Sequence, residues 1–143
     1  MKPGLHPGTA VSFAMTVTSD MRPAFDGKVV HDVMSTVMMI YYMEKAGREM
    51  IVPFLEEGEE GSGYALDIKH VGPALVGQVV TFRAVCTEVA PKRVICDVTA
   101  ETEFNLVGKG SFTQAIFDKK VMARRFMELR GKVEEKQGKH QTS

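Results

Sequence analysis

Apolar and polar positions alternate along residues 9–19, TAVSFAMTVTS, near the start of the chain. The apolar side of this pattern consists of Val11, Phe13, Met15 and Val17. A period of two is typical of a strand with one buried face. The segment that follows, DMRPAFDGK, contains a proline and an Asp-Gly pair, which mark a turn or loop. The chain is therefore expected to open with an amphipathic strand and a loop.

The pattern becomes helical between about residues 36 and 57. Apolar residues and one glycine recur there at steps of three and four, namely Met39, Ile40, Met43, Gly47, Met50, Ile51 and Phe54. Such steps place side chains on one face of a helix. Pro53 falls inside this span, so the regular helix should end or kink near Val52. The EEGEEGSG segment after it is predicted to be an exposed acidic loop.

Four more strands are predicted after the helix. They are YALDIKHVG, QVVTFRAVCTEV, VICDVTAETEF and SFTQAIF, separated by turns at GPALVG, APKR and NLVGKG. Beyond Asp118, the first half of the sequence fits an amphipathic helix anchored by Val121, Phe126 and Leu129, and the polar end is expected to be disordered.

This order of elements favours an α+β class and a hot-dog fold, in which one long central helix is wrapped by a curved antiparallel sheet. We expect a single domain over residues 1–143, with its core at about 9–118 and a C-terminal helix and polar tail at about 119–143. An outer strand of the sheet would offer an edge for dimerisation.

The composition argues against nucleic acid, a membrane or a metal ion as a partner. Eighteen basic and eighteen acidic residues cancel, so no overall field favours nucleic acid. No apolar run approaches the roughly 20 residues of a membrane span, and the start lacks the apolar segment of a signal peptide. Cys86 and Cys96 have no metal-type spacing and are expected to be buried and reduced, as in a cytoplasmic protein. We therefore predict a cytoplasmic location and no metal site.

The sequence contains no Gly-rich phosphate loop and no Gly-x-Ser-x-Gly nucleophile motif, which leaves polar residues inside apolar segments as candidates. Glu44 lies in the apolar helix, where a carboxylate is costly to desolvate. It is either a functional group or an outward-facing charge paired with Lys45 or Arg48. His70 follows Tyr64 by an even step, so it is predicted on the inner face of its strand, as a core histidine or a catalytic one.

Thr36 opens the helix, where a threonine is ordinarily an N-cap. Eight helical residues span about 12 Å, so Thr36 and Glu44 share a site only through a distorted first turn, the lead-in loop or a second subunit. Asp26 and His31 form a competing pair. Their spacing resembles that of the Asp/His pair of hot-dog enoyl hydratases, although the intervening Asn-Pro is missing.

Two stretches together resemble a known family. STVMMIYYMEKAG and GSGYALDIKHVGPALVGQVVTFRA are similar to the hot-dog thioesterases typified by fluoroacetyl-CoA thioesterase, over about residues 30–118. Thr36, Glu44 and His70 keep the family's spacing, and Gly63 also matches. Val37 replaces the proline that usually follows the threonine.

The resemblance implies an acyl-CoA thioesterase that acts on a small or medium acyl-CoA. Coenzyme A would be part of the substrate, and no separate cofactor is implied. Glu44 would be general base or nucleophile, His70 would bind the carbonyl oxygen or protonate the thiolate, and Thr36 would orient Glu44. Gly63, Tyr41 and Phe25 would contact the substrate.

The family also implies a homodimer, or a tetramer built from it, with the pantetheine arm running between subunits. The basic residues offered to its phosphates are Lys92, Arg93, Lys119, Lys120, Arg124 and Arg125. Two alternatives stay open, which are a non-catalytic acyl-CoA-binding protein and a hydratase that uses Asp26 and His31.

Overall fold

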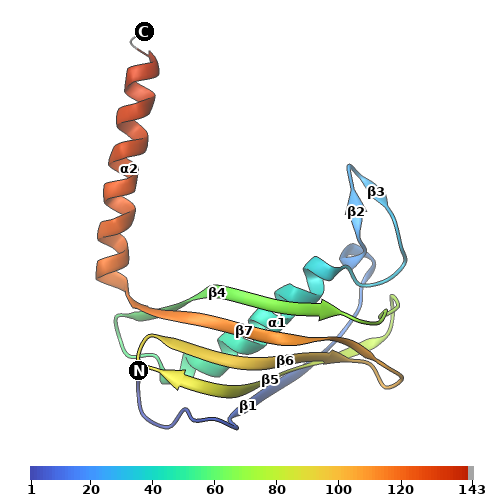
Figure 1. Ribbon diagram of the computed structural model, residues 1–143. Coiled ribbons are helices and arrows are strands. Elements are labelled where there is room, and N and C mark those ends of the chain that lie inside the picture. The colour runs from blue at the N-terminus through green and yellow to red at the C-terminus, as the bar shows by residue number, and fades with distance from the viewer. Residues whose placement is uncertain (142–143) are drawn as a thin grey trace.

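A five-stranded antiparallel sheet packs against one long helix in the computed structural model, which describes residues 1–141 (Figure 1). The strands lie in the order β1-β5-β6-β7-β4. In chain order the elements are β1 (Ala10–Thr16), η1 (Ser19–Met21), β2 (Ala24–Phe25), β3 (Lys28–Val29), α1 (Thr36–Ile51), η2 (Val52–Phe54), β4 (Glu59–His70), β5 (Val79–Ala90), β6 (Arg93–Glu101), β7 (Leu106–Asp118) and α2 (Lys119–Gln141). The predicted α+β arrangement and hot-dog fold are confirmed.

Helix α1 lies where its apolar periodicity predicts. Its buried side carries Met39, Met43, Ala46, Gly47, Met50 and Ile51. The regular helix ends at Ile51 and continues as the 3₁₀ turn η2, which contains Pro53. This end is expected, because proline has no backbone N–H to continue the α-helical hydrogen bonds. Gly47 allows close packing, because a Cβ there would stand 2.5 Å from Cδ2 of Phe112 on β7.

The inner face of the sheet is apolar and alternates with a polar outer face. In β5 and β6 every second residue is buried, and these include Val80, Phe82, Ala84, Val94, Cys96 and Val98. Both cysteines are free and buried, as expected. Burial raises the pKa of the Cys86 thiol, and raises the pKa of Cys96 to about 12.

The acidic segment EEGEEGSG is only partly a loop, which corrects the sequence-based expectation. β4 begins at Glu59 and pairs with β7 along its whole length. Gly61 is needed inside this strand because a Cβ at that position would overlap the side chain of Ile51 on α1. The NLVGKG segment likewise belongs to β7 rather than to a turn. In both segments the glycines predicted a loop. In the structure they lie in strands, where the lack of a side chain lets the strand pack closely on neighbouring residues.

A β-bulge between Gly63 and Ala65 changes the predicted face of Tyr64. The ring of Tyr64 lies under the guanidinium of Arg93, which stands 3.9 Å from the ring centroid. Arg93 belongs to the exposed set of positions on β6, so Tyr64 points to the outer face. His70 lies on the helix side of the sheet, because the bulge changes the alternation only before Ala65, and the residues from Ala65 to His70 alternate regularly.

Two arms project beyond the sheet on the side of the edge strand β4 (Figure 1). One is the hairpin β2–β3, whose turn residues Asp26 and Gly27 both have positive φ. The other is α2, which continues to Gln141, so the part of the predicted disordered end up to that residue is helical. Its Lys, Arg, Glu and Gln residues are good helix formers. Residues 142 and 143 of that predicted tail lie outside the described residues.

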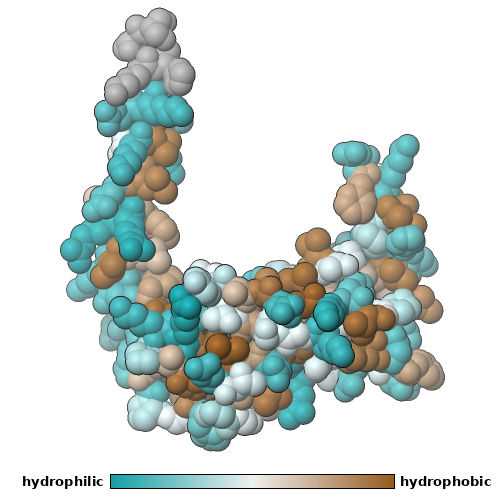
Figure 2. All heavy atoms as spheres, viewed as in Figure 1, coloured by the Kyte–Doolittle hydropathy of each residue, from teal (hydrophilic) through white to brown (hydrophobic). Residues whose placement is uncertain are grey.

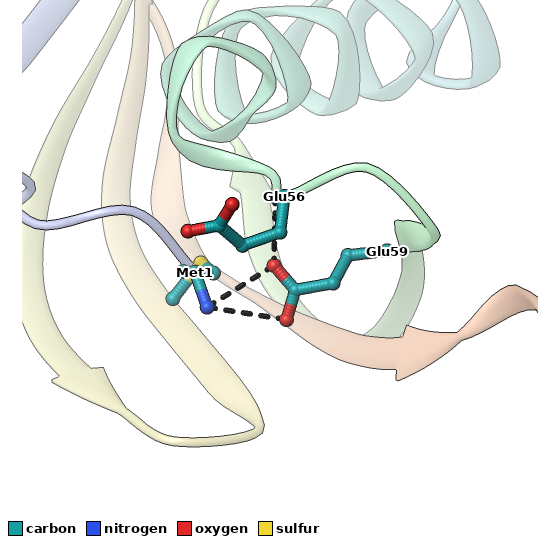
Figure 3. Close-up of polar contacts among 3 residues, drawn as sticks. All are labelled: Met1, Glu56 and Glu59. Carbon is teal, nitrogen blue, oxygen red and sulfur yellow. Dashed lines mark hydrogen bonds and ion pairs between the residues drawn. The ribbon is translucent and has the colours of Figure 1, made fainter.

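The start of β4 is joined to the N-terminus of the chain (Figure 3). The amino group of Met1 stands 3.1 Å from the carboxylate of Glu59, which also accepts a hydrogen bond from the backbone N–H of Glu56. These two partners hold the pKa of Glu59 below its usual value. The contact fixes the chain where η2 turns into the edge strand.

Candidate active site

Thr36 and His70 meet at the N-terminal end of α1. A hydrogen bond of 2.8 Å joins Oγ1 of Thr36 to Nδ1 of His70 on β4. The N-cap of the helix is Ser35, whose side chain accepts from the N–H of Met38. Because Ser35 caps the helix, the Thr36 hydroxyl is available for the histidine, and the expectation that Thr36 is the cap is wrong.

Glu44 lies two turns further along α1, half-buried and beside Gly63 of β4. Its Oε2 is 3.9 Å from the place where a Cβ on Gly63 would stand, so the missing side chain leaves room in front of the carboxylate. The alternative pairing with Lys45 or Arg48 is not formed. Lys45 binds Glu49 at 2.8 Å, and Arg48 binds Glu60.

Among the described residues, Glu44 therefore has no ion-pair or hydrogen-bond partner. Buried polar groups are ordinarily paired, so a half-buried carboxylate without a partner beside a hollow is a candidate functional group. It lines a hollow of about 380 Å³ between α1 and β4, together with Tyr41, Lys45, Arg48, Gly61, Ser62, Gly63, Phe112 and Gln114. The structure thus brings three of the candidates, Glu44, Tyr41 and Gly63, to one hollow.

Gln114 also lines this hollow, and its buried side chain was not among the residues predicted from the sequence. Its Nε2 donates a hydrogen bond of 2.9 Å to the carbonyl of Gly47, and the side chain is 2% exposed. The available signal was its position in β7, where Phe112, Gln114 and Ile116 alternate on the inner face. A glutamine in that phase is an inward polar group that needs a buried partner.

The Thr36–His70 pair and Glu44 do not share one site within a single chain. Eight residues of regular helix place Thr36 and Glu44 about 12 Å apart along the axis. Neither Thr36 nor His70 lines the hollow that holds Glu44. The distorted first turn considered from the sequence is absent, because α1 is regular from Thr36 onward.

The remaining candidates lie elsewhere. Phe25 is 70% exposed on the β2–β3 hairpin and does not line the hollow. Asp26 sits at the tip of that hairpin and His31 in the exposed chain after it, so neither faces Glu44. The basic residues Lys92, Arg93, Lys119 and Lys120 gather at one end of the sheet, since β6 begins where β7 runs into α2.

Two further hollows lie away from α1. One of about 520 Å³ is lined by residues that include Gln78, Glu101 and Glu103, and one of about 430 Å³ mainly by charged and polar residues of the outer sheet face, including Asp67, Asp97 and Lys109. Within the described residues, no group of three or more His, Cys, Asp or Glu side chains is placed to hold a metal ion. No helix there is long and apolar enough to span a membrane.

Comparison with known proteins links this chain to thioesterases. The model of a family described as fluoroacetyl-CoA-specific thioesterase FlK matches residues 17–120. A hypothetical protein of Thermus thermophilus, a thioesterase superfamily member, superimposes with a TM-score of 0.88 at 35% identity, over 93% of this chain and 98% of that one. Among curated protein sequences, none matches the chain significantly.

More distant structures share the fold. The fluoroacetyl-CoA thioesterase FlK superimposes with a TM-score of 0.81 at 21% identity, over 87% of this chain and 97% of that one. A hot-dog-like protein of Thermanaerovibrio acidaminovorans does so with a TM-score of 0.77 at 21% identity, over 89% and 92%. Fold and comparisons together define a hot-dog thioesterase, an enzyme that hydrolyses thioester bonds. The chain belongs to the fluoroacetyl-CoA-specific thioesterase family.

Proposed function

We propose that this enzyme hydrolyses a small or medium acyl-CoA with Glu44 in the hollow between α1 and β4. The observation that carries the proposal is the unpaired carboxylate of Glu44 opposite Gly63, while both neighbouring cations are bound to other carboxylates. The hollow of about 380 Å³ suits an acyl group of modest size.

Thioester hydrolysis adds water across the C–S bond and yields a carboxylic acid and a thiol. In the proposed reaction Glu44 takes a proton from water as the oxygen attacks the carbonyl carbon, or it attacks that carbon itself to form an anhydride. The C–S bond then breaks, and the thiolate of coenzyme A takes up a proton. On the second route, water then hydrolyses the anhydride, which releases the carboxylic acid and regenerates Glu44. Gly63 lets the carbonyl approach, because a side chain there would occupy the space before Glu44.

His70 is proposed to serve the carbonyl oxygen or the leaving thiolate. Its Nδ1 is engaged by Thr36, which fixes the ring and leaves Nε2 as the atom that meets the substrate. Thr36 is in this scheme a positioning residue for His70 rather than for Glu44. The scheme requires His70 to reach the reaction catalysed by Glu44, which one chain does not provide.

A homodimer supplies the missing contact. β4 is the edge strand of the sheet, and its free edge exposes Leu66, so it is suited to antiparallel pairing with a second copy. If the two-fold axis passes beside Asp67, the two copies of Asp67 face each other, and the bulge at Tyr64 brings Gly63 of one copy across from His70 of the other. Glu44 of one chain then works with the Thr36–His70 pair of the second, at two equivalent sites.

The proposal has no cofactor other than the coenzyme A of the substrate. The basic end of the sheet, at Arg93 and Lys119, is offered to the phosphates. Tyr41 lines the acyl hollow, while Phe25 would contact substrate only from the hairpin. We also propose a cytoplasmic location, which free, buried cysteines and a coenzyme A thioester substrate support.

The test is thiol release from a panel of short, branched and aromatic acyl-CoAs, measured with a thiol reagent. Glu44→Gln keeps the shape of the side chain and should lower kcat/KM by about 10²–10⁴-fold, the usual share of a general base. Glu57→Gln is the control, because Glu57 is an exposed carboxylate that does not line the hollow. The protein's own thiols should stay silent in this assay, since burial raises both of their pKa values.

Each outcome decides between the alternatives. Hydrolysis that survives in Glu44→Gln would remove Glu44 from the mechanism. Acyl-CoA binding by calorimetry without thiol release from any substrate would favour the non-catalytic alternative. Loss of hydrolysis in Glu44→Gln, with Glu57→Gln active and both folded by circular dichroism, would support the proposal.

A further inference from the structure

The C-terminal helix α2 carries an apolar stripe that no other described residue of its own chain covers. Met122, Phe126, Leu129 and Val133 follow one another at steps of four, three and four, which places them on one side of the helix. Phe126 is 64% and Leu129 is 61% exposed. Phe126, Leu129 and Val133 also line a shallow hollow of about 210 Å³ with Arg130. Large exposed side chains in a row mark a contact surface.

The β2–β3 hairpin has an apolar surface of the same kind. Phe25, Val29 and Val30 are about half to two-thirds exposed. Each strand of the hairpin has only two residues, and an isolated two-stranded hairpin is marginally stable in water. A hairpin so small gains order from packing against another element. Figure 2 shows apolar side chains both on this arm and on the side of α2 that is turned toward it.

The two arms cannot meet within one chain. α2 starts beside the first residue of β4, because Asp118 pairs with Glu59. The hairpin lies at the other end of β4, where His70 contacts Thr36 and the N–H of Ser35 bonds to the carbonyl of Met21. The twelve residues of β4 separate these ends by about 40 Å.

A two-fold axis across β4 brings the arms together. Antiparallel pairing places the first residue of β4 in one copy beside the last residue of β4 in the other. The α2 helix of each copy then rises at the end of the sheet where the second copy's hairpin projects, and both arms extend past β4 toward the partner (Figure 1). At 23 residues, or about 35 Å, α2 is long enough to run across the end of that neighbouring sheet.

We infer that α2 of each subunit docks its Phe126–Leu129–Val133 stripe on the β2–β3 hairpin of a second copy of this chain. The inference rests on the homodimer of the proposed function. In the dimer, the exposed stripe of each subunit is covered by the small hairpin of the other, so the same contact forms twice.

The experiment is disulfide trapping between two differently tagged chains. One chain carries Phe126→Cys and the other carries Val29→Cys, so a disulfide between these positions can form only across subunits. Mixed under mild oxidation, they should give a covalent heterodimer at least tenfold faster than the pair with Met127→Cys in place of Phe126→Cys. Met127 is the matched control, because it is 73% exposed on the same turn but points about 100° away from Phe126. The native cysteines are buried and should not compete.

A second measurement uses charge in place of a cross-link. Phe126→Asp combined with Leu129→Asp should raise the dissociation constant of the dimer at least tenfold, as buried interface anchors do, whereas Met127→Asp should change it less than twofold. Because the stripe is exposed in a single chain, the variants should keep the native circular dichroism spectrum.

The outcomes separate this inference from the proposed function. A dimer by light scattering that cross-links no faster at Phe126 than at Met127 would overturn the docking and leave the β4 dimer standing. A monomeric mass for the native chain would overturn both the dimer and the docking, while thiol release would still test the role of Glu44. Rapid cross-linking at Phe126 together with weakened dimers in the Asp variant would support the docking.

Discussion

Helix α1 has two sides that differ in packing and in chemistry. The side that faces β5, β6 and β7 is closed, with Met39, Met43 and Met50 at most 1% exposed. The side toward β4 is open and carries Thr36 and Glu44. There the sheet presents glycine at Gly63 rather than a large side chain.

This difference shows that stability and chemistry are carried by different neighbours of one helix. Burying apolar side chains stabilises the fold, while unpaired polar groups beside a hollow cost stability and provide reactivity. Changes on the open side should therefore alter catalysis with the fold intact. Changes on the closed side should alter the free energy of unfolding.

After that of Glu44, the largest effect is expected at His70, also on the open side. His70→Asn removes the ring nitrogen that would serve the substrate, and should lower kcat/KM for thiol release by about 10²–10³-fold, equivalent to about 3–4 kcal/mol. The melting temperature should change little, because the ring is only half-buried. Lys69→Ala is the control, since Lys69 is exposed and points to the other face of β4. Retention of activity within threefold in His70→Asn would place the chemistry elsewhere.

The two sides were also unequally predictable from the sequence. The closed side could be predicted, because Met39, Met43 and Met50 repeat with the helical period and Pro53 marks the end of the helix. Glu44 and His70 stood out as polar residues in apolar segments, and the resemblance to a family gave them roles. The separation of Thr36 from Glu44 followed from helix length alone, whereas the contact between Thr36 and His70 did not.

What could not be predicted depends on contacts between distant segments. The glycines near Gly61 favour a loop locally, yet they lie in β4 because Ile51 on α1 occupies the space that a side chain would need. The bulge after Gly63 turns Tyr64 to the outer face of the sheet. A prediction that assumes strict alternation of side chains along the strand cannot include such a bulge. The polar end of α2, from about residue 131, has Val133 as its one large apolar residue, so its composition alone favoured disorder over helix.

A smaller effect is expected on the closed side, at Gly47. Gly47→Ala adds a methyl group 2.5 Å from the buried ring of Phe112, which cannot move freely, so the substitution should lower the free energy of unfolding by about 1–3 kcal/mol. The same change at Gly131 of α2 meets no neighbour within 4 Å. Gly131→Ala should leave the domain unchanged or stabilise it by up to about 1 kcal/mol, through helix propensity. Urea denaturation of both variants measures the contrast. Equal behaviour of the two would mean that α1 packs less tightly on β7 than described.

The smallest effect concerns the polar contact that holds the first residue of β4. The Glu56 N–H and the Met1 amino group stabilise ionised Glu59, so its folded pKa lies below the ordinary value of 4.5. Its contribution to stability is therefore fully present above that value and is lost as the pH falls through the lower, folded pKa. Glu59→Gln should melt slightly earlier than the native protein at neutral pH, and the difference should shrink to nothing in acid. Glu57→Gln, at a neighbouring exposed carboxylate, should match the native protein throughout. A difference for Glu59→Gln that persisted unchanged in acid would show that shape, rather than charge, holds this end of β4 in place.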